Sequence, residues 1–185
     1  MSQTTQHDLI GIADVAAKIP AFLKKVPNLV NGLRQAYLRT PNTAAGLGLA
    51  FEKAVQRNPE GIALRFEDQS FSYTELNGWA NQIAHYYLSL GAKKGDVVAL
   101  MVENRPEMVA SVIGLAKLGV TIALLNTSQV GKVLAHSINL VKPIALIVGD
   151  ECHAAVAEIR DELNIAADRF HWFADQNTQE NAGQA

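Results

Sequence analysis

The sequence predicts an α/β fold in which a mostly parallel sheet carries helices on both faces. Three apolar runs support this prediction: Val97–Val102, Val120–Leu125 and Ile144–Val148. They recur at intervals of roughly 24 residues, enough for a strand, a helix and two tight loops. None alternates polar with apolar residues, which is typical of strands buried on both faces. The segments between them have apolar residues at steps of three and four, which predicts amphipathic helices and a three-layer architecture.

Composition indicates a globular protein. The 185 residues are 49% hydrophobic and 18% charged, with a formal charge of −2 and a pI near 6.2, so nothing suggests nucleic-acid binding. Cys152 is the single cysteine, which excludes an internal disulfide and favours a reducing compartment. The apolar runs are far shorter than a membrane-spanning helix, and the N-terminus does not resemble a secretory signal. We therefore expect a cytoplasmic protein, with peripheral attachment to the inner face of the membrane as an option.

The first 41 residues are predicted to form a basic amphipathic extension. Residues 15–50 contain no Asp or Glu but five basic side chains, which alternate with apolar ones. The basic residues are Lys18, Lys24, Lys25, Arg34 and Arg39. This pattern suits an anionic membrane surface contacted through residues 10–39. It also suits a helix packed on the rest of the protein, an interpretation slightly favoured by Pro20 and Pro27, which should divide the stretch into short pieces.

Residues 42–174 are predicted to form part of a larger α/β subdomain that begins with a helix and a hairpin. The helix should run from Asn42 to Asn58, with Leu47, Phe51, Ala54 and Val55 facing inward. Two short strands should follow, Ala63–Glu67 and Ser70–Phe71, joined by a tight turn.

The stretch FSYTEL, residues 71–76, predicts the start of a helix and not an active site. Ser72 and Glu75 have the spacing of a capping box, with Phe71 and Leu76 placed as a hydrophobic staple. One helical face should follow, formed by Leu76, Trp79, Ile83, Tyr87 and Leu90, before Gly91 ends the helix. No base near Ser72 supports a catalytic role.

The remaining elements follow from similar signals. Asn104 is the expected cap of a helix that has Pro106 in its first turn and ends at Gly119. The next helix should place inward five apolar residues: Val130, Val133, Leu134, Ile138 and Val141. A helix from about Glu151 to Leu163 and a strand at His171–Ala174 complete the pattern, and residues 175–185 are predicted to be disordered.

The nucleotide motifs that such a sheet invites are incomplete. ENRPE follows the first apolar run, where a dinucleotide fold needs glycines. NTSQVGKV follows the second and resembles a P-loop, but Asn126 replaces its first glycine and Val133 its magnesium-binding hydroxyl. Lys132 is therefore expected to be an ordinary surface side chain.

Cysteine and histidine offer no readable site either. Cys152 and His153 are adjacent and should point about 100° apart on a helix, so they are not expected to act as nucleophile and base. His85 and His136 lack partners at metal-ligand spacing. We assign no catalytic, cofactor-binding or metal-binding residue.

Four segments in order nevertheless resemble a known family: FSYTEL, KKGDVVALMVENRPE, GLAKLGVTIALLNTS and LAHSINLVKPIALIVGDE. Across residues 51–151 the chain resembles the N-terminal subdomain of adenylate-forming enzymes, and most resembles bacterial long-chain and very-long-chain acyl-CoA synthetases, which are similar to fatty acid transport proteins. The resemblance implies a ligase that uses ATP and Mg²⁺ to convert a fatty acid into an acyl-adenylate. Coenzyme A then displaces AMP to give the thioester.

The resemblance also implies motifs that the 185 residues do not contain. The family's Ser/Thr/Gly-rich phosphate loop ending in Lys, of the type TSGTTGxPK, occurs nowhere in the chain. We therefore expect a fragment of a ligase that is inactive alone and binds ATP, Mg²⁺ and coenzyme A weakly if at all. Two alternatives stay open: a stand-alone module that docks on a membrane or partner, and a nonfunctional remnant. Acyl-chain length and oligomeric state are not predicted.

Overall fold

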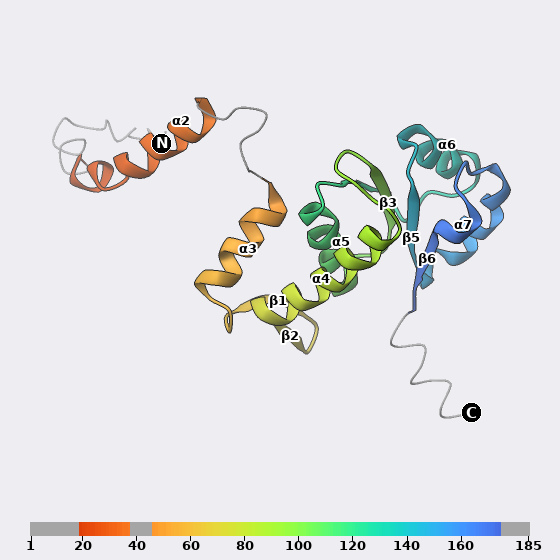
Figure 1. Ribbon diagram of the computed structural model, residues 1–185, viewed down its shortest axis with the longest axis horizontal. Coiled ribbons are helices and arrows are strands. Elements are labelled where there is room, and N and C mark those ends of the chain that lie inside the picture. Colours follow the sequence, from red (N-terminus) through yellow and green to blue (C-terminus); the bar gives the residue numbers. More distant parts are fainter. Residues whose placement is uncertain (1–18, 38–45, 175–185) are drawn as a thin grey trace, which may run out of the picture. The chain divides into compact units, whose positions relative to one another are not determined.

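The structure, a computed structural model, describes residues 19–37 and 46–174. It divides into two compact units, Met1–Ala44 and Ala45–Ala185, which are taken separately here (Figure 1). The predicted tail at residues 175–185 and the predicted helix residues 42–45 lie outside the described residues.

The described part of the first unit is helical. Residues 19–23 form helix, Lys24 and Lys25 form a turn, and helix α2 follows at Val26–Tyr37. Pro27 is the second residue of α2, where its missing N–H costs no helical hydrogen bond. The expectation that Pro27 breaks the stretch is therefore only partly right, since it marks the start of a 12-residue helix. None of the described helices is long and apolar enough to cross a membrane.

The second unit is built on a four-stranded parallel sheet. Its strands are β3 (Val97–Met101), β4 (Thr121–Leu124), β5 (Ala145–Gly149) and β6 (Phe170–Phe173), in the spatial order β4-β3-β5-β6. Val98 pairs with Ile122 on one side and with Ala145 on the other. All three predicted apolar runs are strands and all run in the same direction, which confirms the predicted parallel sheet.

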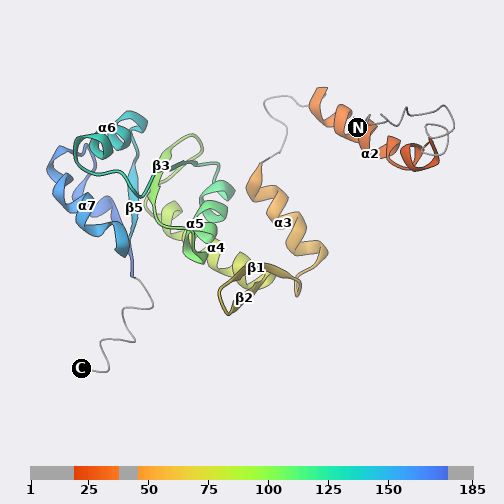
Figure 2. The same cartoon turned by 180° about the vertical axis from the view of Figure 1, so that it is seen from behind.

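Helices cover both faces of this sheet, as predicted (Figures 1 and 2). Helices α4 (Tyr73–Ser89) and α5 (Pro106–Lys117) lie on one face, and α6 (Gly131–Val141) and α7 (His153–Glu158) on the other. Alternate residues of β3 divide between the two layers. Val98 and Leu100 pack with Leu115 of α5, whereas Ala99 and Met101 pack with the α6 side chains.

The strands differ in how far they are buried. All of β5 is buried and β3 nearly so, but Leu124 in β4 is 62% exposed. The expectation that each apolar run is covered on both sides is wrong for β4, because this strand lies at the edge of the sheet.

The predicted hairpin is present, with Glu67 in its turn and not in its first strand, and the start of α4 confirms the prediction from FSYTEL. Strands β1 (Ile62–Phe66) and β2 (Gln69–Ser72) pair antiparallel around a turn in which Glu67 has a positive φ of 51°. The Ser72 hydroxyl accepts from the Glu75 N–H at 3.2 Å, and the Ser72 N–H donates to the Glu75 carboxylate at 2.8 Å. These hydrogen bonds favour the ionised carboxylate and lower the pKa of Glu75. The capping box is therefore formed in full.

Helix α3 (Leu47–Arg57) has Gly46 as its N-cap and keeps most of its predicted inward face, because Phe51, Ala54 and Val55 are partly buried. Leu47 is exposed rather than inward, while Gly48 is the buried residue. A Cβ at Gly48 would lie 2.8 Å from the backbone of Lys117, so the glycine permits the close approach of α3 to α5.

Three further predictions need correction. The N-cap of α5 is Arg105 and not Asn104, because Pro106 occupies the first helical position and fixes the cap just before it. Val130, the N-cap of α6, and Val133 are exposed, whereas Leu134 and Ile138 are buried as predicted, together with Ala135. The predicted single helix at 151–163 is divided into a 3₁₀ turn at Asp150–Cys152, α7, and a second turn at Arg160–Glu162.

Candidate functional site

The carboxyl ends of β3, β4 and β5 define the candidate site. In parallel α/β sheets this edge is where ligands bind, because the loops that leave the strands form a crevice there. Three polar loops converge at this edge: Glu103–Arg105 after β3, Asn126–Ser128 after β4 and Asp150–Cys152 after β5.

Glu151 connects the loops that follow β3 and β5. Its Oε1 accepts a hydrogen bond of 2.7 Å from the backbone N–H of Glu103. Its Oε2 lies 3.4 Å from Nη1 of Arg105. One carboxylate therefore holds together two loops separated by 48 residues in sequence.

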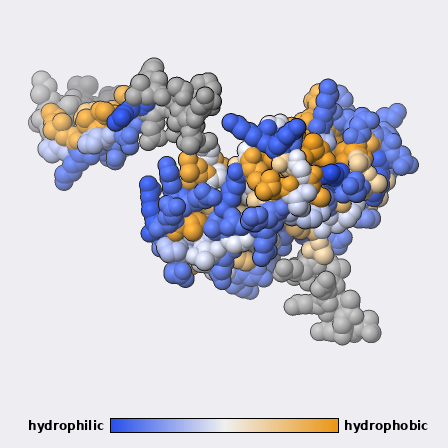
Figure 3. All heavy atoms as spheres, in the orientation of Figure 1, coloured by the Kyte–Doolittle hydropathy of each residue, from blue (hydrophilic) through white to orange (hydrophobic). Residues whose placement is uncertain are grey.

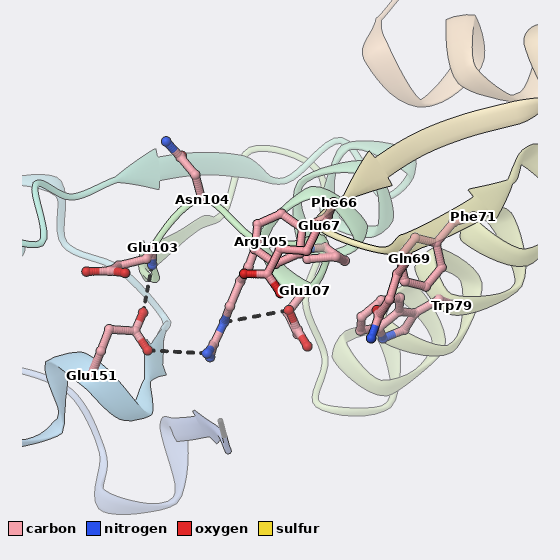
Figure 4. Close-up of a pocket in the computed structure, with 11 residues that line it drawn as sticks. Phe66, Glu67, Gln69, Phe71, Trp79, Glu103, Asn104, Arg105, Glu107 and Glu151 are labelled. Atoms are coloured by element: carbon pink, nitrogen blue, oxygen red, sulfur yellow. Dashed lines mark hydrogen bonds and ion pairs between the residues drawn. The ribbon is translucent and has the colours of Figure 1, made fainter. Parts of the chain in front are cut away.

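Arg105 is the centre of this network (Figure 4). Besides Glu151, it pairs with Glu107 at 3.6 Å and donates from Nη2 to the carbonyl of Phe173 at 3.2 Å. Its side chain is only 12% exposed. The Arg105 contacts thus join the ends of β3, β5 and β6. Removal of one partner would cost more than the loss of a surface ion pair, because it would leave a largely buried charge unpaired.

A cavity of about 400 Å³ opens beside Arg105. The hairpin supplies one wall through Phe66, Gln69 and Phe71, with Trp79 of α4 beside them (Figure 4). A second hollow of about 420 Å³ lies at the ends of β3 and β4 and is lined by Asn104, Asn126 and Thr127.

The charges at this edge do not fit the triphosphate of ATP. Four glutamates line the cavity beside Arg105, at positions 67, 103, 107 and 151, against a single arginine. That arginine is already paired with two of the carboxylates. Phosphate sites use backbone N–H groups of glycine-rich loops together with basic side chains, and this cavity presents neither in a free form. Among the described residues no three His, Cys, Asp or Glu side chains gather at metal-binding spacing.

A third hollow, of about 520 Å³ and mainly apolar, lies between α4 and the end of the sheet at β6. Inside it the Tyr87 hydroxyl is hydrogen-bonded to Nδ1 of His171. Burial raises the pKa of the Tyr87 phenol and lowers the pKa of the His171 imidazole. Both shifts favour the neutral forms, so this pair is suited to holding β6 against α4 rather than to exchanging protons near neutral pH.

The residues weighed from the sequence do not assemble into a site. The Asn126 side chain accepts a hydrogen bond from the Ser128 N–H at 2.9 Å, which fixes a local turn. Lys132 is exposed in the first turn of α6.

Cysteine and histidine are likewise dispersed. Cys152 is buried in the core, and burial raises the pKa of its thiol to about 11. The His153 ring lies against Trp172, with ring centroids 4.5 Å apart. His85 and His136 are exposed.

Arg105 and Glu151 were not singled out from the sequence. A usable signal was present, because ENRPE and DE each follow a predicted parallel strand directly. Charged residues at the carboxyl ends of neighbouring parallel strands are expected to meet.

The fold and this edge define the class of protein: an α/β subdomain whose polar loops gather at the carboxyl end of a parallel sheet, as in nucleotide-dependent enzymes. A family model described as "AMP-binding enzyme" matches residues 51–184. The chain therefore belongs to the AMP-binding enzyme family, in agreement with the resemblance drawn from the sequence.

Two relatives of the chain have names that refer to fatty acids. The chain is 34% identical over 152 residues to the medium/long-chain-fatty-acid–CoA ligase FadD6 of Mycobacterium tuberculosis, covering 82% of this chain and 26% of the relative. It is 39% identical over 122 residues to the long-chain fatty acid transport protein 1 of Rattus norvegicus, covering 65% of this chain and 19% of the relative. The chain thus spans about a quarter or less of the length of these relatives.

Solved structures agree on the fold. The N-terminal domain of FACL13 from Mycobacterium tuberculosis superposes with a TM-score of 0.62 at 22% identity, over 76% of this chain and 36% of that one. The anthranilate CoA ligase AuaEII superposes with a TM-score of 0.65 at 22% identity, over 72% and 25% of the two chains. These likenesses establish the acyl-CoA synthetase N-terminal fold for the second unit.

Proposed function

We propose that this chain supplies the N-terminal part of a fatty acid–CoA ligase. The intact enzyme activates the carboxylate of a fatty acid with ATP and Mg²⁺, forms an acyl-adenylate with release of pyrophosphate, and transfers the acyl group to coenzyme A. Activation is needed because a carboxylate is a poor electrophile with a poor leaving group. The observation that carries the proposal is the 34% identity to FadD6 over most of the chain.

In this proposal the described residues have a structural role, which is to hold the loops at the carboxyl edge of the sheet. Arg105 and Glu151 lock the loops at the carboxyl edge of the sheet, and the hairpin closes one side of the cavity. The poor match between the glutamate-rich cavity and a triphosphate supports the expectation that the 185 residues do not adenylate a fatty acid alone. We place the intact protein in the cytoplasm.

A transplant tests the ligase assignment. Residues 51–174 would replace the matching segment of a FadD6-type ligase, and the chimera would be assayed for fatty-acid-dependent ATP–pyrophosphate exchange and acyl-CoA formation. We expect activity in the chimera and none in the isolated 185-residue chain. A chimera that unfolds at the same temperature as its parent but catalyses neither reaction would contradict the proposal, and exchange by the isolated chain would contradict its inactivity.

A docking role for the first unit is a second candidate. It is favoured by one observation, the exposure of the apolar side chains of residues 19–33. The two roles are compatible, since they use different units of the chain. A variant that lacks residues 1–41 separates them, because we expect its second unit to fold unchanged.

A further inference from the structure

The first unit presents one continuous apolar stripe. Six side chains, each between 49% and 59% exposed, make up this stripe: Ile19, Phe22, Leu23, Leu29, Val30 and Leu33. Successive members are one, three or six positions apart, a spacing that places them on one side of the helical stretch. The coloured spheres of this unit in Figure 3 show the result, an orange side backed by a blue one.

Helix α2 shows the separation of the two sides most clearly. At about 100° per residue, Leu29, Val30 and Leu33 fall within an arc of about 100°. Asn28 and Asn31 lie on the opposite side. A helix with this division rests its apolar side against a nonpolar medium while its polar side stays in water.

The charged residues of the first unit indicate what kind of surface the apolar stripe contacts. The described basic side chains of this unit, Lys24, Lys25 and Arg34, are all exposed, and none forms an ion pair within residues 19–37 and 46–174. The stretch at 15–50 holds five of the chain's sixteen basic residues and none of its eighteen acidic ones. An apolar stripe bordered only by positive charge complements a surface that combines acyl chains with negative headgroups.

The two lysines lie where the helical stretch turns. The Lys25 N–H donates to the Phe22 carbonyl at 2.8 Å, and the Lys25 carbonyl accepts from the Leu29 N–H at 3.0 Å. Helical hydrogen bonds therefore continue on both sides of the turn. Long basic side chains at such a position reach the headgroup layer while their stems follow the apolar surface.

We propose that residues 19–34 dock in the plane of an anionic lipid membrane, with the stripe in the acyl region and Lys24, Lys25 and Arg34 at the lipid phosphates. This inference identifies the partner of the proposed docking role and is independent of the ligase reaction. A second copy of the chain is a poorer occupant, because each stripe would bring its own positive border against that of the other. The depth is interfacial, since no described helix spans a membrane.

Vesicle flotation of the whole 185-residue chain tests the proposal. Vesicles of phosphatidylcholine with 30% phosphatidylserine would be compared with vesicles of phosphatidylcholine alone. We expect flotation with the anionic vesicles, weakened by raised salt and greatly reduced with the neutral ones. A basic residue near an anionic surface contributes roughly fivefold in partitioning, so K24E/K25E should lower binding by at least about 25-fold.

Two further variants complete the design. F22S/L29S removes apolar contact and should also abolish flotation, whereas N28S/N31S, a matched change on the opposite side of the helix, should leave it unchanged. All variants should retain the unfolding transition of the second unit. The proposal is overturned if wild type floats with neither vesicle, if K24E/K25E floats as well as wild type, or if the stripe instead drives a dimer that F22S/L29S dissolves.

Discussion

Helices α2 and α6 both have apolar residues at steps of three and four, but these residues are buried in α6 and exposed in α2. In α6 the side chains of Leu134 and Ile138 are fully buried on the sheet. In α2 the equivalent stripe residues Leu29 and Leu33 are 54% and 50% exposed. Apolar periodicity thus establishes that a helix has a face to bury, but not what buries it. The flanking residues supply that information, because α6 is followed directly by the fully buried β5, whereas α2 lies in a stretch free of acidic charge.

The largest contrast should come from truncating one leucine in each unit. Leu146 is the second residue of β5 and is fully buried, so Leu146→Ala should cost about 2–5 kcal/mol of unfolding free energy, measured by urea denaturation. Leu29→Ala should change that free energy by less than about 0.5 kcal/mol. Equal losses from the two substitutions would remove the distinction between the units.

The next effect concerns the contact between α4 and α5. A Cβ at Gly114 would lie 2.5 Å from the carbonyl oxygen of Ala80, so Gly114→Ala should destabilise the second unit by about 1–3 kcal/mol. Gly78 of α4 is the matched control, because a Cβ there meets no atom within 4 Å. Gly78→Ala should stabilise by up to about 1 kcal/mol through helix propensity. Thermal unfolding of both variants measures the difference, and a neutral Gly114→Ala would show that the two helices are not so closely packed.

A smaller effect is expected at the start of α4. Ser72→Ala removes the acceptor for the Glu75 N–H and should lower stability by about 1 kcal/mol. Ser72→Asp retains an acceptor at the cap and should remain close to wild type. Denaturation of the three proteins side by side tests this, and an Asp variant as weak as the Ala variant would argue against the cap.

The smallest effect is a pH dependence that arises at β6. Because burial lowers the pKa of His171 below its ordinary value of 6.5, the unfolded state binds more protons than the folded state just below that pH. The contribution of the neutral His171 to the free energy of unfolding should therefore be fully present above pH 6.5. It should be lost as the pH falls from there towards the lower pKa of the folded state. His171→Asn should flatten this fall, whereas His85→Asn, at an exposed position of α4, should keep it. Identical pH profiles for wild type and His171→Asn would contradict the assignment.

Features that depend on residues close together in the sequence could be predicted, whereas features that depend on the order of strands in the sheet could not. The capping box at Ser72 and Glu75 and the direction of β3 and β5 depend on neighbouring residues or on a repeated pattern, and both predictions are confirmed. The exposure of Leu124 depends on the order of strands in the sheet, which periodicity does not encode. Val133 and Leu134 both fit the helical period of an inward face, but Leu134 is buried and Val133 is exposed.

The candidate site shows the same limit more clearly. Glu103 and Glu151 are 48 residues apart, and only the pairing of β3 with β5 brings their loops together. Pro106 indicated where α5 begins, but the role of Arg105 depends on partners at the ends of two other strands, β5 and β6. Such contacts become predictable once the strand order is known, not before.

The second unit buries the apolar side chains of β3 and β5 within itself, whereas we propose that the stripe on the first unit is covered by an anionic membrane. Amide hydrogen exchange of the whole chain, with and without phosphatidylserine vesicles, tests it most directly. We predict rapid exchange at Leu29–Leu33 without vesicles, marked protection there when vesicles are added, and no change in the slow exchange of β3 and β5. Protection of α2 that is already complete without vesicles, or exchange that the vesicles leave unaltered, would contradict the claim.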